Sequence, residues 1–119
     1  MTRVFVYGTL KRGGDNHAHL AYQQFLGEAR TPPGYTLYWL GDYPGMVRAA
    51  DDTAGVTGEL WAVDDSCLTQ LDLLEGTAEG LYERVSLKLA TPADGQPVET
   101  YLYLGSIAGH PALGAEWRG

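Results

Sequence analysis

The chain has 119 residues, of which 45% are hydrophobic. This length and composition predict one compact domain, residues 1–119, and the chain is too short to suggest a second one. The formal charge is −7 at pH 7, and the eight Lys and Arg residues are scattered along the chain. Because a protein that binds nucleic acid needs a basic patch for the phosphate backbone, we expect no nucleic-acid partner.

Neither a membrane span nor a secretory signal is visible in the sequence. No apolar run approaches the roughly 18 residues of a transmembrane helix, and residues 1–8 enter a strand-like pattern at once. Cys67 is the single cysteine and cannot form an internal disulfide, which agrees with a reducing compartment. We therefore expect a cytoplasmic protein without a membrane partner.

The first third of the chain predicts a strand, a glycine-rich loop and a short helix. Residues 3–7 are β-branched or aromatic and favour a strand, which runs straight into the loop. Within residues 16–27, Leu20, Gln23 and Gln24 stand at helical spacing before a glycine. We expect a short helix in this segment.

The middle of the chain predicts three strands. Residues 35–40 form an aromatic run after a Pro-Pro-Gly turn signal, and residues 43–50 suit a turn that enters a short strand. Residues 55–63 alternate in the manner of a strand. Gly58 interrupts this last strand, and it is tolerable either at a bulge or at a closely packed bend.

A helix follows, because the hydrophobic period changes after residue 63. Asp64, Asp65 and Ser66 are candidate N-caps, and Gly76 is a natural C-cap. We expect the helix to lie between these residues.

Two more strands are predicted at residues 81–91 and 98–105. The Asp-Gly pair between them is a strong turn signal, so we expect a hairpin. Residues 106–119 have no period and predict an irregular tail, in which Trp117 can pack against the domain.

Glu75 stands where local propensity does not explain a charge. It shares a helical stripe with Leu68 and Leu71, which must face the core. It also lies in the last turn, where the helix dipole disfavours an anion by ~0.3–1 kcal/mol. Burial and the dipole would both raise the pKa of this carboxyl toward the range of a general acid or base. The alternative is a helix-end glutamate that turns into water, and Asp72 is expected on the solvated face.

The glycine-rich loop resembles a phosphate-binding loop only in part. Two glycines have the spacing of a Walker A motif, but Gly14 and Asp15 stand where that motif requires Lys and Ser or Thr, so a P-loop is excluded. The backbone N–H groups of Gly8, Thr9 and Leu10 could form a concave set of donors for one carboxylate or oxyanion. The alternative is an ordinary glycine turn.

Metal and cysteine chemistry are not favoured. Asp15, His17 and His19 form a cluster, but two histidines at i and i+2 of a helix point to different faces and no further ligand is near, so we expect no metal site. Cys67 has no predictable histidine partner and suits a small buried apolar residue. Three tyrosines can either line a pocket or pack within a sheet: Tyr82, Tyr101 and Tyr103.

Three motifs, taken together, resemble the gamma-glutamylcyclotransferase-like family: VYGTLKRG (residues 6–13), DYPGMV (residues 42–47) and LDLLEGTAEGLYERV (residues 71–85). The resemblance spans nearly the whole chain and rests on the order and spacing of the motifs. It implies an α+β fold, a small mixed β-barrel flanked by short helices, with a cavity at one end. It also implies Glu75 as the catalytic acid/base. The substrate-binding residues that it implies are Tyr7, Gly8, Thr9, Leu10 and Tyr82.

In enzymes of this family the substrate's own α-amino group attacks its γ-carbonyl, which closes 5-oxoproline and expels an amine or amino acid. The resemblance therefore implies a small-molecule γ-glutamyl substrate and neither a metal nor a cofactor. Two alternatives stay open: a non-catalytic binding domain for a γ-glutamyl metabolite, and a structural or interaction module. The leaving group is also open among glutathione, γ-glutamyl amino acids, γ-glutamylamines and γ-glutamyl-protected secondary metabolites.

Overall fold

The structure is a computed structural model, which describes residues 1–118 as strands with one α-helix. The strands are β1 (Thr2–Val6), β2 (Gln24–Arg30), β3 (Tyr35–Trp39), β4 (Pro44–Arg48), β5 (Thr57–Val63), β6 (Tyr82–Lys88), β7 (Pro97–Tyr103) and β8 (Ala112–Gly114). The helical segments are the 3₁₀ turn His17–Leu20 and α1 (Asp65–Leu74). None of the helices in this part of the chain has the length and apolar character needed to cross a membrane.

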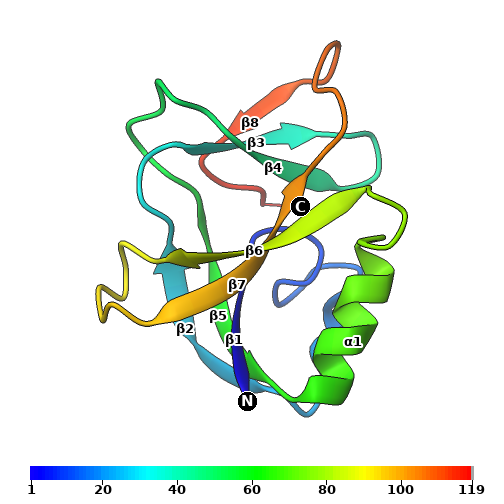
Figure 1. Cartoon of the computed structure of the whole chain (residues 1–119). Helices are drawn as coiled ribbons and strands as arrows, with labels where there is room; N and C mark the ends of the chain where they lie inside the picture. Colours follow the sequence, from blue (N-terminus) through cyan, green and yellow to red (C-terminus); the bar gives the residue numbers. More distant parts are fainter. Residues whose placement is uncertain (119) are drawn as a thin grey trace.

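The strands form two sheets (Figure 1). The larger sheet has the order β2-β5-β1-β7-β6, and the smaller has the order β4-β3-β8. Strand β1 runs parallel to β7 and antiparallel to β5, so the larger sheet is mixed. The predicted α+β class with a mixed sheet is confirmed, although the ladders found over residues 1–118 form two sheets and do not close into one ring.

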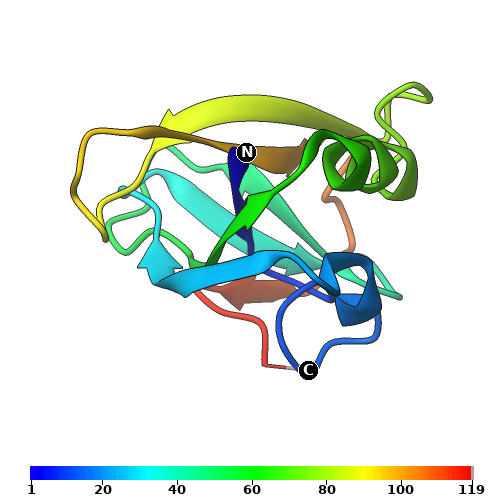
Figure 2. The same ribbon diagram turned by 90° about the horizontal axis from the view of Figure 1, so that it is seen from below.

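The helical segments lie together on one flank of the strands. Both views of the ribbon show α1 next to the 3₁₀ turn His17–Leu20 (Figures 1 and 2). Of the candidate N-caps, Asp64 accepts a hydrogen bond from the backbone N–H of Cys67 at 2.7 Å. The helix ends at Leu74. The predicted helix is confirmed, and Cys67 is buried within it, as expected of a small apolar residue.

The prediction of a short helix within residues 16–27 is wrong. One 3₁₀ turn ends at Leu20, and β2 begins at Gln24 and pairs with β5, with a register shift between Phe25 and Gly27. Leu20 is buried at the end of the turn, and Phe25 packs its ring 5.3 Å from that of Trp61. The ladder to β5 and this packing outweigh the weak helical propensity of a segment with few apolar residues at helical spacing.

The C-terminal hairpin is confirmed, but the tail is more ordered than expected. Strands β6 and β7 pair antiparallel around a turn with Gly95 at a φ of 69°. Strand β8 lies in the segment expected to be irregular and pairs with β3. Trp117 stacks on Trp39, with the ring centroids 6.3 Å apart. The tail lacks a visible period because β8 has only three residues, and Gly119 lies outside the described residues.

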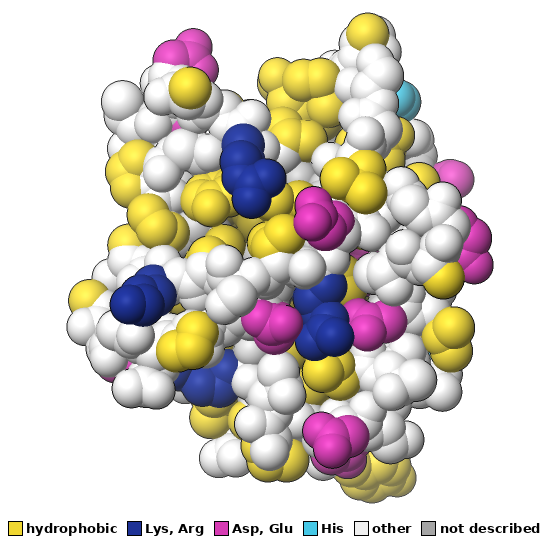
Figure 3. Space-filling view, in the orientation of Figure 1, with side chains coloured by type: hydrophobic (Ala, Val, Ile, Leu, Met, Phe, Trp, Pro, Cys, Tyr) yellow, Lys and Arg dark blue, Asp and Glu magenta, His cyan; other side chains and the backbone are white. Residues whose placement is uncertain are grey.

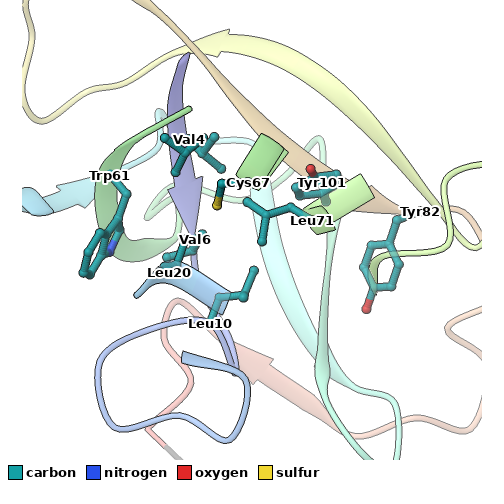
Figure 4. Close-up of a cluster of buried hydrophobic side chains, with 10 residues drawn as sticks. Val4, Val6, Leu10, Leu20, Trp61, Cys67, Leu71, Tyr82 and Tyr101 are labelled. Atoms are coloured by element: carbon teal, nitrogen blue, oxygen red, sulfur yellow. The ribbon is translucent and has the colours of Figure 1, made fainter. Parts of the chain in front are cut away.

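Strand β1 supplies both halves of the core. Val4 and Val6 lie in a cluster with Leu71 of α1, which reaches toward them from the helix (Figure 4). Phe5 points to the opposite face and lies in a second cluster with Met46 of β4. The alternation of side chains along a strand explains this division, and it explains why Val4, Phe5 and Val6 are all buried.

Gly58 is required by close packing. Its partner in the ladder is Ala29, without a register shift at this point, so there is no bulge. A Cβ at this position would overlap the carbonyl oxygen of Val6 and lie 2.8 Å from Cζ of Phe5. Of the two explanations open from the sequence, the closely packed one holds.

We predict that Gly58→Ala lowers the free energy of unfolding by about 1–3 kcal/mol, because the added methyl group has no room in the core. The measurement is urea unfolding at equilibrium. Ser86→Ala, at an exposed position of β6, is the control and should leave stability nearly unchanged. An unfolding midpoint for Gly58→Ala equal to that of the wild type would contradict the packing explanation.

Candidate active site

A cavity of about 170 Å³ lies at the end of β1, between the last turn of α1 and the first residues of β4 and β6. Glu75 lines it, together with all the residues that the resemblance implied for substrate binding: Tyr7, Gly8, Thr9, Leu10 and Tyr82. The fold thus brings the candidates from two distant motifs to one place. Their roles in binding and catalysis stay predictions.

Sequence reasoning did not identify several residues of the cavity wall. Asn16, Tyr43, Leu74 and Leu81 also line the cavity, as does Tyr101, which the sequence left open. Tyr43 belongs to the short Tyr-Pro motif, and both leucines directly precede a candidate residue. Nearness in sequence was their only available signal.

Glu75 caps the C-terminal end of α1 and turns toward the cavity. Its backbone remains helical, with φ −81° and ψ −4°, and its N–H donates to the carbonyl of Leu71. Burial raises the pKa of this carboxyl to about 7. The raised pKa predicted from the sequence is therefore present, and the alternative of a side chain turned into bulk water is not what the structure shows.

A comparison with Glu59, a second buried glutamate, shows why the raised pKa of Glu75 is unusual. Glu59 of β5 is 7% exposed and accepts hydrogen bonds from Trp61 and from both the backbone N–H and the Nε of Arg12. Burial by itself would raise its pKa, but these hydrogen bonds and the Arg12 charge lower the pKa below its usual range. For Glu75, burial is the one cause of the raised pKa, and over residues 1–118 no hydrogen bond or ion pair to its carboxylate offsets this effect. The Glu75 carboxylate is therefore available to interact with a ligand.

The loop after β1 keeps backbone donors unused. The carbonyl of Gly8 accepts from the N–H of Lys11 at 3.0 Å, and the carbonyl of Thr9 accepts from the N–H of Asn16 at 2.9 Å. The Asn16 side chain also donates to Oγ1 of Thr9. No hydrogen bond within the described chain uses the N–H groups of Gly8, Thr9 or Leu10. These three amides are therefore available to an anion in the cavity.

Gly8 is required because Pro44 lies against it. A Cβ on Gly8 would be 2.6 Å from Cγ of Pro44. The Tyr82 hydroxyl donates to the carbonyl of Pro44 at 3.0 Å and so holds the proline in this position. The absence of a side chain allows the loop and the start of β4 to form adjacent walls of the cavity.

The hydroxyl of Tyr7 makes two hydrogen bonds to the backbone of other strands. This group donates to the carbonyl of Tyr101 at 2.7 Å and accepts from the N–H of Met46 at 3.2 Å. Burial raises the pKa of Tyr7 well above its ordinary value, so the hydroxyl keeps its proton. Tyr7 thereby connects the end of β1 to both β7 and β4.

Asp72 does not lie on the solvated face as expected. Its Oδ1 accepts from the hydroxyl of Tyr101 at 2.7 Å and lies 3.2 Å from Nε of Arg84. Arg84 also contacts Glu99 at 3.1 Å, and acidic and basic side chains adjoin each other on this face (Figure 3). The expectation failed because the side chains of Arg84 on β6 and Tyr101 on β7 reach this side of α1, which the helical period cannot reveal. The network connects the last turns of α1 to both strands.

His17 of the N-terminal segment has structural contacts. The His17 ring lies 5.4 Å from that of Trp61, and its Nδ1 is 3.0 Å from the carbonyl oxygen of Leu10. Over residues 1–118, no three His, Cys, Asp or Glu side chains are grouped as metal ligands would be.

Comparison with known proteins places the chain in a family. The family described as gamma-glutamyl cyclotransferase, AIG2-like matches residues 4–119. The chain therefore belongs to this family. A solved structure of YtfP from Escherichia coli is similar, with a TM-score of 0.71, 30% identity, and coverage of 98% of this chain and 96% of that one.

Relatives with related names come from distant organisms. The gamma-glutamylaminecyclotransferase of Homo sapiens is 36% identical over 82% of this chain and 67% of its own. A protein of Vibrio cholerae, provisionally named a gamma-glutamylcyclotransferase, is 50% identical, and the match spans 60% of each chain. The family and fold implied by the sequence motifs are confirmed.

Glu75→Gln should stabilise the protein in alkaline solution. The folded-state pKa of about 7 lies above the ~4.3 of a glutamate in an unfolded chain. The folded state therefore binds the proton more tightly, and the free energy of unfolding falls as the pH rises between these two values. At about pH 8 the neutral Gln should raise the free energy of unfolding by on the order of 1–3 kcal/mol, and the gain should vanish near about pH 4.

The measurement is urea unfolding of both proteins across this pH range. Glu79→Gln, at a nearby exposed glutamate, is the matched control and should give no such pH-dependent gain. A difference between Glu75→Gln and wild type that stays constant with pH would show that burial of this carboxylate carries no cost.

Proposed function

We propose that this chain is a gamma-glutamyl cyclotransferase that converts γ-glutamyl amides into 5-oxoproline and a free amine or amino acid, with Glu75 as the general acid/base. The observation that carries the proposal is the position of Glu75. Its carboxyl has a pKa of about 7 and no protein partner within residues 1–118, and it lines the same cavity as the three unused loop amides.

The cavity provides what the cyclisation requires. The loop amides of Gly8, Thr9 and Leu10 hold the substrate's α-carboxylate, and the surrounding aromatic wall keeps the γ-glutamyl chain folded. In this folded form the substrate's α-nitrogen lies close to its own γ-carbonyl carbon. The nucleophile thus comes with the substrate, so the buried Cys67 has no part in the reaction.

Glu75 moves protons from the attacking nitrogen to the departing nitrogen. Its carboxylate takes a proton from the α-ammonium group, and the free amine attacks the γ-carbonyl carbon to form the ring C–N bond. Glu75 gives this proton to the departing nitrogen and then takes the second proton, which the ring nitrogen must lose to become the lactam N–H. Collapse of the tetrahedral intermediate breaks the original amide C–N bond, and the released amine takes the second proton from Glu75 and leaves as an ammonium ion. A pKa near neutrality makes both transfers accessible to one group.

We predict that the protein releases 5-oxoproline from at least one member of a panel of γ-glutamyl amides, and that Glu75→Gln lowers kcat by at least ~100-fold, the usual contribution of general acid-base catalysis. Because Glu75 has little part in holding the α-carboxylate, the dissociation constant of the substrate should change modestly. The readouts are 5-oxoproline formation and calorimetric titration of the inactive variant.

Glu79→Gln is again the control and should retain wild-type turnover. Full activity of Glu75→Gln would contradict the assignment of this residue. Binding of γ-glutamyl amides without any release of 5-oxoproline would instead indicate a non-catalytic binding domain.

The anion held by the loop can be tested with a changed substrate. If the amides hold the α-carboxylate, its replacement by a neutral carboxamide should weaken binding to Glu75→Gln by about 10- to 100-fold, the range for hydrogen bonds to a charged group. If the loop instead stabilises the oxyanion of the transition state, the carboxamide should bind normally. A substitution at Gly8 answers the question less directly, because any Cβ there displaces Pro44.

A further inference from the structure

Asn16 connects the loop after β1 to the cavity in two ways. Its backbone N–H donates to the carbonyl of Thr9 at 2.9 Å, and its side-chain Nδ2 donates to Oγ1 of Thr9, also at 2.9 Å. Among residues 11–17, which follow the loop amides, Asn16 is the one that lines the cavity. Asn16 therefore holds a residue of the loop while facing the same space as a ligand.

The hydroxyl of Thr9 has a proton that the protein does not use. A threonine hydroxyl carries one proton and two acceptor lone pairs. Because Oγ1 of Thr9 accepts from Nδ2 of Asn16, its own proton must point in another direction. Over residues 1–118, no acceptor forms a hydrogen bond with this proton, and Thr9 lines the cavity. The proton is therefore available to an acceptor on a ligand.

The chain between these two residues leaves Asn16 little freedom to move. Gly14 lies so close to Thr9 that a Cβ at position 14 would overlap the carbonyl oxygen of Thr9. The N–H of Gly14 also donates to the carbonyl of Lys11 at 2.8 Å. The segment is thus closed on itself before a ligand binds, so its hydrogen bonds do not have to be organised during binding.

An anion in this cavity depends on neutral donors. The described lining contains no Lys, Arg or His, and Glu75 is its one charged side chain. A carboxylate has about four lone-pair sites on its two oxygens, so the three loop amides leave one site for a further donor. The Thr9 hydroxyl is a neutral group of the lining that can fill this site.

We propose that Asn16 is a positioning residue for the substrate: its amide directs the proton of the Thr9 hydroxyl into the cavity, where this hydroxyl is a fourth donor to the substrate's α-carboxylate. This inference rests on the proposed function, because it assigns the loop amides to that carboxylate. The hydroxyl contributes in the same way before and during the reaction, so its loss weakens binding and leaves kcat nearly unchanged.

Variants of Thr9 test the hydroxyl. In the Glu75→Gln protein, Thr9→Val should raise the dissociation constant of a γ-glutamyl amide by about tenfold, since a hydrogen bond to a charged group is lost, whereas Thr9→Ser should keep it within about twofold. The α-carboxamide analogue should lose much less affinity, because its acceptor carries no charge. Calorimetric titration gives both constants, and a loop that was merely distorted would weaken both ligands alike.

Asn16→Asp tests the direction of the proton. The new carboxylate accepts the Thr9 proton and turns it away from the cavity, while the backbone hydrogen bond to Thr9 does not involve the altered side chain. Binding should weaken by at least about tenfold in the Glu75→Gln protein. In a Thr9→Val background the same substitution should cost clearly less, because only the repulsion between the two carboxylates remains.

Thr36→Val is the matched control. Thr36 is a half-buried threonine of β3 whose Oγ1 donates to the carbonyl of Gly114 at 3.3 Å, and it does not line the cavity. This substitution should leave the dissociation constants of both ligands unchanged.

Two results would overturn the inference while wild-type release of 5-oxoproline keeps the proposed function intact. One is an equal loss of affinity for the carboxylate and carboxamide ligands in Thr9→Val. The other is a cost of Asn16→Asp that is the same with and without the Thr9 hydroxyl. Failure of every γ-glutamyl amide to yield 5-oxoproline would overturn the proposed function, and this inference with it.

Discussion

The hydroxyl of Tyr7 connects the parts of the molecule that form the cavity. It donates to a carbonyl of β7 and accepts from an N–H of β4, so the end of β1 is bound to both sheets at once. The chain turns directly after this residue, and the loop amides are therefore placed against the start of β4. Because the hydroxyl is buried, loss of either contact would leave an unpaired polar group, which makes this arrangement costly to change.

Asp72 and Glu75, at the C-terminal end of α1, are both carboxylic acids, but their surroundings differ. Asp72 pairs with Arg84 and Tyr101 on one side of the helix, whereas Glu75, three residues later, is enclosed without a partner in the described chain. The first contributes to holding the helix on β6 and β7. The second carries an electrostatic cost in the folded protein, and such a cost is typical of a group whose proton affinity serves catalysis.

The cavity combines an inner polar end with an apolar opening. Unused amides and an acidic group line the cavity, where we propose that the γ-glutamyl part of a substrate binds, and Leu74 and Leu81 are the exposed residues of the lining. This division suits a family that keeps one chemical step while the departing group varies. Residues that hold the common part must be placed by the core, whereas residues at the opening can change with little effect on the fold.

The sequence by itself determined the elements whose signals are local: β1, α1 between its caps, the hairpin of β6 and β7, and the unusual position of Glu75 on an apolar stripe. The tertiary structure alone decided that residues 24–30 form a strand, that β8 exists, and that Asp72 is covered. These features depend on ladders and contacts between residues far apart in the chain, and hydrophobic periodicity contains no information on such partners. For the same reason the need for glycine at position 8 became clear only from the proline that lies against it.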